Sequence, residues 1–103
     1  GSPNADTRAN RAEQRKAAAD RRAELAPLKK AMTAAEKTVE RLTAELATLD
    51  EQLASPDLYA DGAKASRISL ERGQTAKRLS EAEEAWLEAT AAYEDAAEHA
   101  ATA

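Results

Sequence analysis

An apolar stripe runs through the first half of the sequence, and its members are alternately three and four residues apart. It starts at Leu25 and continues through four heptads to Leu53. The stripe consists of Leu25, Leu28, Met32, Ala35, Val39, Leu42, Leu46, Leu49 and Leu53. A repeat of 3.5 residues stays on one face only when the helix supercoils around a partner helix. The sequence therefore predicts a coiled coil.

A second stripe with the same spacing, but with weaker residues, occupies the second half of the chain. It consists of Ile68, Arg72, Thr75, Leu79, Ala82, Trp86, Ala89, Tyr93 and Ala96. Between the two stripes, Pro56 disfavours a helical conformation at Ser55, so the first helix should end there. Ser55 and Pro56 suit the N-cap and first position of a short helical turn, and Asp61 suits the cap of the next helix.

Folding the chain back at this turn gives an all-α antiparallel two-helix coiled-coil hairpin. When Leu53 is aligned with Ile68, the residue numbers of facing positions add up to 121. In this register the bulky Trp86 faces the small Ala35, as close packing requires. We expect a helix over about 27–54, a turn over 55–61 and a second helix over about 62–99.

Two places in the hairpin are expected to be weak. Arg72 and Thr75 are polar residues in the second stripe, and Gly73 lies between them, so a kink or frayed stretch is expected over 68–76. Pro27 cannot donate a helical hydrogen bond and is expected to limit the regular hairpin. We therefore divide the chain into a tag remnant and basic, partly helical linker (1–24), the hairpin (25–99) and a frayed tail (100–103). Gly1 and Ser2 resemble a tag remnant, which suggests an excised fragment.

The composition excludes most other classes of fold and site. Of 103 residues, 28 are Ala and only ten are Leu, and Phe and Cys are absent. No apolar run approaches the ~20 residues of a membrane span, so we expect a cytoplasmic chain without membrane contact. The single His99 lies near the chain end, without the fixed ligands of a metal site or a base for a nucleophile. We predict no catalytic residue, no metal and no cofactor.

Charge is distributed unevenly along the chain. Through Arg41 there are ten basic and six acidic residues, and from Leu42 onward five basic and thirteen acidic residues. The basic residues are densest in a stem that we define as residues 8–30. Its cations are Arg8, Arg11, Arg15, Lys16, Arg21, Arg22, Lys29 and Lys30. Such a run can hold phosphates, and the competing interpretation is a solvated helical linker.

Two segments resemble a known family. The turn Leu-Ala-Ser-Pro-Asp-Leu-Tyr-Ala-Asp at 53–61 and the segment Glu-Ala-Glu-Glu-Ala-Trp-Leu-Glu-Ala at 81–89 resemble the C-terminal coiled-coil domain of ABC-F ATPases, typified by Uup and YheS. The segment from Arg21 to Lys30 is most similar to the YheS-like branch. The resemblance covers about residues 20–97. In that family two nucleotide-binding domains precede this module and hydrolyse ATP, and both are missing here.

The resemblance implies a role in binding DNA or ribosomal RNA, and contact with the ATPase domains of the same parent chain. Besides the stem, the tip of the hairpin offers candidate contacts to nucleic acid. These are Tyr59, which could stack on a base, and the cations Lys64, Arg67 and Arg72. The alternative is a structural or regulatory coiled coil without nucleic-acid contact. Leu70 and Leu87 lie outside the stripe, so a homodimer is the alternative to the expected monomer.

Overall fold

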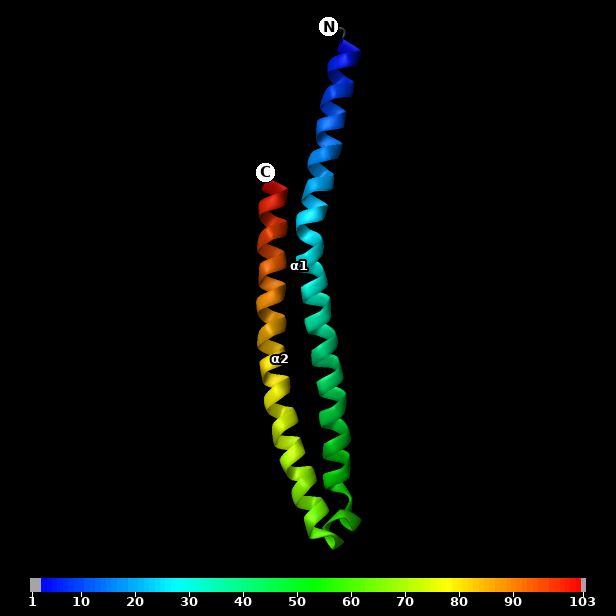
Figure 1. The fold of residues 1–103 in the computed structure, drawn as a ribbon, viewed down its shortest axis with the longest axis vertical. Helices are drawn as coiled ribbons and strands as arrows, with labels where there is room; N and C mark the ends of the chain where they lie inside the picture. The colour runs from blue at the N-terminus through cyan, green and yellow to red at the C-terminus, as the bar shows by residue number, and fades with distance from the viewer. Residues whose placement is uncertain (1–2, 103) are drawn as a thin grey trace.

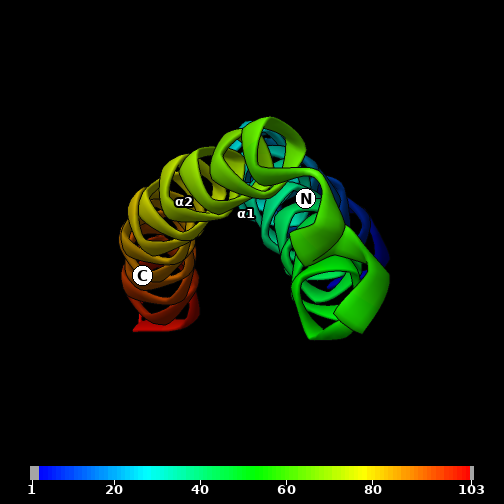
Figure 2. The ribbon, with the colours of Figure 1, turned by 90° about the horizontal axis from the view of Figure 1, so that it is seen from below.

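The computed structural model describes residues 3–102 as one long helical hairpin of 87 × 17 × 14 Å. Helix α1 spans Pro3–Ala54, a short 3-10 helix η1 spans Pro56–Ala60, and helix α2 spans Gly62–Thr102. The two long helices run antiparallel side by side from the tip (Figures 1 and 2). This confirms the predicted all-α coiled-coil hairpin. The expected tag remnant at residues 1 and 2 and the last residue of the expected tail lie outside the described residues.

The interface between the helices follows the two predicted stripes. Every position of both stripes is buried or half-buried, although most of the intervening residues are exposed. Leu42 and Ile68 are the most deeply buried, each with 4% of its surface exposed. A two-helix hairpin has no third layer to cover its flanks, so most stripe residues remain partly open to solvent.

The predicted register agrees with the contacts across the interface. Arg72 of α2 donates a hydrogen bond from Nε to Oδ1 of Asp50 on α1 over 2.5 Å, and these numbers add up to 122. Glu45 and Arg78, whose numbers add up to 123, border the same groove between the helices. They form no ion pair, because Glu45 accepts from Arg41 on its own helix at 3.1 Å.

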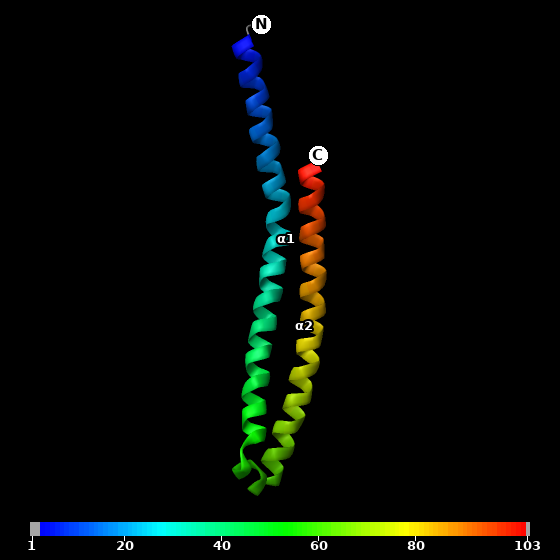
Figure 3. The ribbon, with the colours of Figure 1, turned by 180° about the vertical axis from the view of Figure 1, so that it is seen from behind.

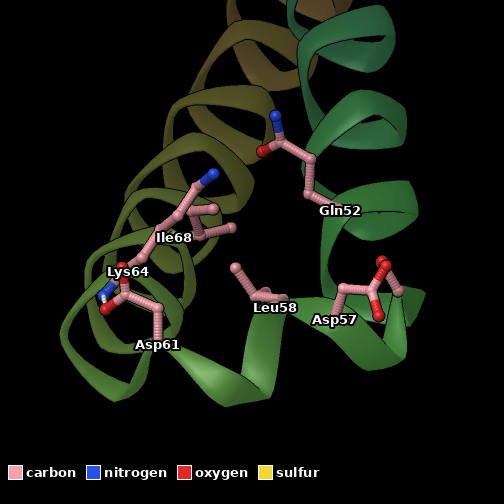
Figure 4. A pocket seen from close by; sticks show the side chains of 7 residues that line it. Gln52, Asp57, Leu58, Asp61, Lys64 and Ile68 are labelled. Carbon is pink, nitrogen blue, oxygen red and sulfur yellow. Dashed lines mark hydrogen bonds between the residues drawn. The ribbon is translucent and has the colours of Figure 1, made fainter.

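The tip is stabilised by a helix cap at the start of α2 and by one buried leucine. Asp61 confirms its predicted role, since its Oδ1 accepts from the backbone N–H of Lys64 at 3.1 Å. Ser55 lies at the N-cap of η1 with Pro56 following, but its side chain makes no capping hydrogen bond. Leu58 is buried and points toward Ile68 in the hollow of the tip (Figure 4). The turn therefore extends the apolar interface beyond the last stripe residues.

Helix α1 is longer than the sequence suggested. It was expected from about residue 27, yet it begins at Pro3 and continues through Pro27. A proline within a helix removes one backbone hydrogen bond and costs about 3 kcal/mol. The flanking segments are rich in Ala, Arg, Lys and Glu, which are strong helix formers on both sides of this defect. Helix α2 likewise extends past the expected end at about residue 99, to Thr102.

The stretch expected to kink or fray, residues 68–76, is helical throughout. Thr75 has only 6% of its surface exposed, so this stretch contains two of the buried residues of the interface. The charge of Arg72 is met by Asp50. A Cβ at Gly73 would meet no atom within 4 Å, so this glycine lies on the open side of α2. The expectation of fraying was wrong because neighbouring burial and the cross-helix ion pair offset the weak residues.

Candidate nucleic-acid interface

Helix α1 extends well beyond the end of α2, as both side views show (Figures 1 and 3). In the register of the hairpin, Thr102 at the end of α2 lies beside residue 19. Residues 4–17 therefore form an overhang beyond the end of α2, and every one of them is exposed. Four cations and two acidic residues lie in this overhang. A ligand can reach it from all sides.

Four cations of the stem recur at intervals of seven residues, namely Arg8, Arg15, Arg22 and Lys29. In a coiled-coil helix this interval returns to the same face. We call this row the basic strip. It covers about 32 Å at a rise of ~1.5 Å per residue, and all four residues are exposed.

A matching acidic row accompanies the basic strip on another face of α1. Asp6, Glu13 and Asp20 also recur at intervals of seven residues, each two positions before an arginine. Two positions correspond to about 200° around a helix, so the acidic row lies nearly opposite the basic strip. The predicted stem rested on the number of these charges and not on their period. The seven-residue interval would have revealed that the stem has one cationic face.

The other predicted stem cations lie around this strip. Arg11 and Lys16 are exposed, whereas Arg21 is half-buried because it continues the stripe of α1 toward the end of α2. Lys30 and Lys29 border a hollow on the outside of α1, and Lys37 completes its rim. Lys37 was not among the predicted cations, but it lies seven residues after Lys30 and thus on the same face.

Helix α2 is strongly acidic over its C-terminal half, the last part of which lies beside the stem. Residues 79–101 contain seven Asp or Glu and no Lys or Arg. A polyanion is repelled by this part of α2 and attracted by the basic strip. The hairpin therefore presents an electrostatically asymmetric surface, on which the flank of α1 is the favourable side for phosphate groups.

The predicted tip residues are largely engaged in holding the hairpin together. The Tyr59 hydroxyl donates to the carbonyl of Leu53, in the last turn of α1, at 2.7 Å. The hydrogen bond and the charge of Asp50 raise the pKa of Arg72 above its ordinary value, so the guanidinium stays protonated. Lys64 and Arg67 are exposed. The tip and the stem are at opposite ends of the molecule, so the structure does not unite them in one site (Figure 1).

Within the part of the chain that the structure describes, no group of three or more His, Cys, Asp or Glu could hold a metal ion. His99 lies beside Asp95, with Nδ1 at 2.8 Å from the Asp95 carbonyl oxygen and at 3.6 Å from Oδ1.

None of the described helices is both long and apolar enough to cross a membrane.

These features define an elongated coiled-coil hairpin with a basic stem. Residues 8–91 match the family described as the ABC transporter C-terminal domain, so the chain belongs to that family. This domain is found in ABC-F proteins such as Uup, which confirms the predicted relationship. Neither a curated protein nor a solved structure is significantly similar to the chain.

Proposed function

We propose that this hairpin is the non-catalytic C-terminal module of a cytoplasmic ABC-F ATPase and contributes to binding DNA or ribosomal RNA. The membership of the family supports the link to a parent with ATPase domains. Within this module, the stem of α1 is the surface that binds phosphate groups. ATP hydrolysis belongs to the domains of the parent and requires no residue of the hairpin.

The observation that carries this proposal is the basic strip. Arg8 and Arg15 lie on the overhang, and Arg22 and Lys29 continue the same face along the paired part of α1. Among the residues that the structure describes, no hydrogen bond or ion pair engages their side chains, so all four are available to phosphates. Four phosphate contacts give a strong dependence of affinity on salt, with a slope of about −3.6 in log K against log salt for duplex DNA.

The structure favours contact with the phosphate backbone over stacking on bases. Trp86 and Tyr93 are half-buried between the helices. Tyr59 is 63% exposed, but its hydroxyl is tied to the end of α1. Stacking on exposed aromatic rings is what usually holds single strands. We therefore expect the stem to bind structured nucleic acid better than unstructured single strands.

The test is a titration of the hairpin with branched DNA and with ribosomal RNA fragments at several salt concentrations. Arg8→Gln combined with Arg15→Gln should weaken binding and make the salt slope shallower by about two. The matched control, Lys77→Gln with Arg78→Gln, removes two exposed cations from α2. It should leave most of the slope in place.

Two outcomes would contradict the proposal. One is the absence of any complex at low salt. The other is an equal loss of affinity in both double variants, which would mean that binding depends on total charge and not on the strip. Circular dichroism of each variant would show whether the helices are intact.

A further inference from the structure

One large apolar side chain is left uncovered in the middle of the acidic half of α2. Leu87 has 67% of its surface exposed. Glu83 and Glu84 lie one turn before it on the helix, and Glu88 follows it directly. An apolar residue among charges can form the core of an interface whose rim is polar.

A hollow of complementary character lies on the outer side of α1. The small residues Ala26, Thr33 and Ala34 form its floor, and lysines form its rim, namely Lys29, Lys30 and Lys37. An apolar side chain can rest on such a floor, and the lysines can meet the carboxylates around it. The surroundings of Leu87 and of this hollow thus have opposite charge.

Leu87 and the hollow occupy the same height and the same flank of the hairpin. In the register observed, Leu87 is level with Ala34, because these numbers add up to 121. Leu87 follows the stripe residue Trp86, and Thr33 follows the stripe residue Met32, so both have the same heptad position. In an antiparallel pair of helices, equivalent heptad positions lie on the same side.

We propose that two copies of the hairpin associate side by side in parallel, with Leu87 of each copy seated in the hollow on α1 of the other. A two-fold axis along the hairpin brings α1 of one copy against α2 of its partner. Such an interface closes on itself and makes each contact twice. It therefore needs no surface beyond those present on one chain.

Charge complementarity selects a second copy as the occupant. Glu83 and Glu84 around Leu87 would meet Lys37 of the partner, which lies at the same height in this register, so these charges are neutralised together. The parallel orientation also places the two overhangs at the same end. Arg8 and the rest of the overhang remain uncovered, and this inference does not depend on whether they bind nucleic acid.

The test is sedimentation velocity over a range of protein concentrations at about 50 mM and about 500 mM salt, where charges are screened over different distances. The wild-type chain should dimerise reversibly, and more weakly at the higher salt. Leu87→Glu should raise the dissociation constant of the dimer at least tenfold, because it removes two buried leucine contacts and adds like charges. Leu70→Glu is the matched control, since Leu70 is 64% exposed on the same helix. It should leave dimerisation unchanged.

A charge exchange tests the pairing of the rims. Lys37→Glu should weaken the dimer, and the addition of Glu84→Lys should restore it. A spin label at Lys16→Cys, possible because the chain has no native cysteine, reports the orientation. A parallel dimer gives a short distance between the labels.

Three results would overturn the inference. A chain that stays monomeric at high concentration and low salt would exclude the dimer. Equal effects of Leu87→Glu and Leu70→Glu would indicate nonspecific association. A long distance between the labels would exclude the parallel arrangement. None of these results concerns Arg8 and Arg15 on the overhang, whose binding of nucleic acid is measured separately with the double variant.

Discussion

Helix α1 consists of two regions that are continuous in backbone but different in environment. From residue 19 to Ala54 it lies against α2 or the tip, whereas residues 4–17 extend beyond the end of α2. The stripe of α1 continues into the overhang with the same spacing, but there its members are Gln14 and Arg11. Apolar residues thus stop where the partner helix stops.

This difference separates two causes of helical structure. In the paired region, burial of Leu42 and its neighbours stabilises the helix. In the overhang, only the intrinsic preference of Ala, Arg and Glu and the pairing of nearby charges favour it. An isolated helix of this length is marginal in water. The overhang is therefore well suited to ordering on a ligand, and the paired region to serving as its rigid support.

The largest expected difference between the two regions is in hydrogen exchange. Amides in the paired part around Leu42 should exchange only through opening of the hairpin, whereas those of residues 4–17 should exchange by local fraying. We expect at least about a thousandfold difference in protection, measured by mass spectrometry or NMR. Equal protection of both regions would mean that the overhang is covered in solution.

Substitutions at equivalent stripe positions should show the same contrast in stability. Leu42→Ala removes a buried side chain and should lower the free energy of unfolding by about 2–4 kcal/mol. Arg11→Ala lies on the same stripe, but on the exposed overhang, and should change it by less than about 0.5 kcal/mol. Chemical denaturation followed by circular dichroism measures both. If Arg11→Ala were as damaging as Leu42→Ala, the overhang would have to be packed against something.

The sequence predicted the fold through the spacing of its apolar residues, because an apolar repeat of 3.5 residues indicates a coiled coil. The prediction was less accurate for residues whose unfavourable local effect is offset by contacts with distant parts of the chain. Arg72 looked like a defect in the second stripe, yet its guanidinium reaches Asp50 on the opposite helix. Pro27 was expected to limit the hairpin, but the helix continues through it. Helix propensities describe how much such residues destabilise a helix, but they do not describe the tertiary contacts that offset this loss.

The candidate interface was only partly predictable for a related reason. The density of cations in the stem was visible, but their arrangement depended on knowing that residues 8–30 are one continuous helix. Only then do Arg8, Arg15 and Lys29 fall on one face. For Tyr59 the sequence suggested a contact with a ligand, because an aromatic residue in a turn can stack on a base. The structure instead shows an internal contact, since the Tyr59 hydroxyl donates to the carbonyl of Leu53.

The smallest expected effect concerns Gly73, which lies in the paired region but on its open side. A Cβ there would meet no atom within 4 Å. Gly73→Ala should therefore raise the free energy of unfolding by about 1 kcal/mol, because alanine loses less backbone entropy in a helix. Thermal denaturation measures the gain. A loss of stability would mean that this side of α2 is covered in solution, so the variant also reports on the extent of free surface in the paired region.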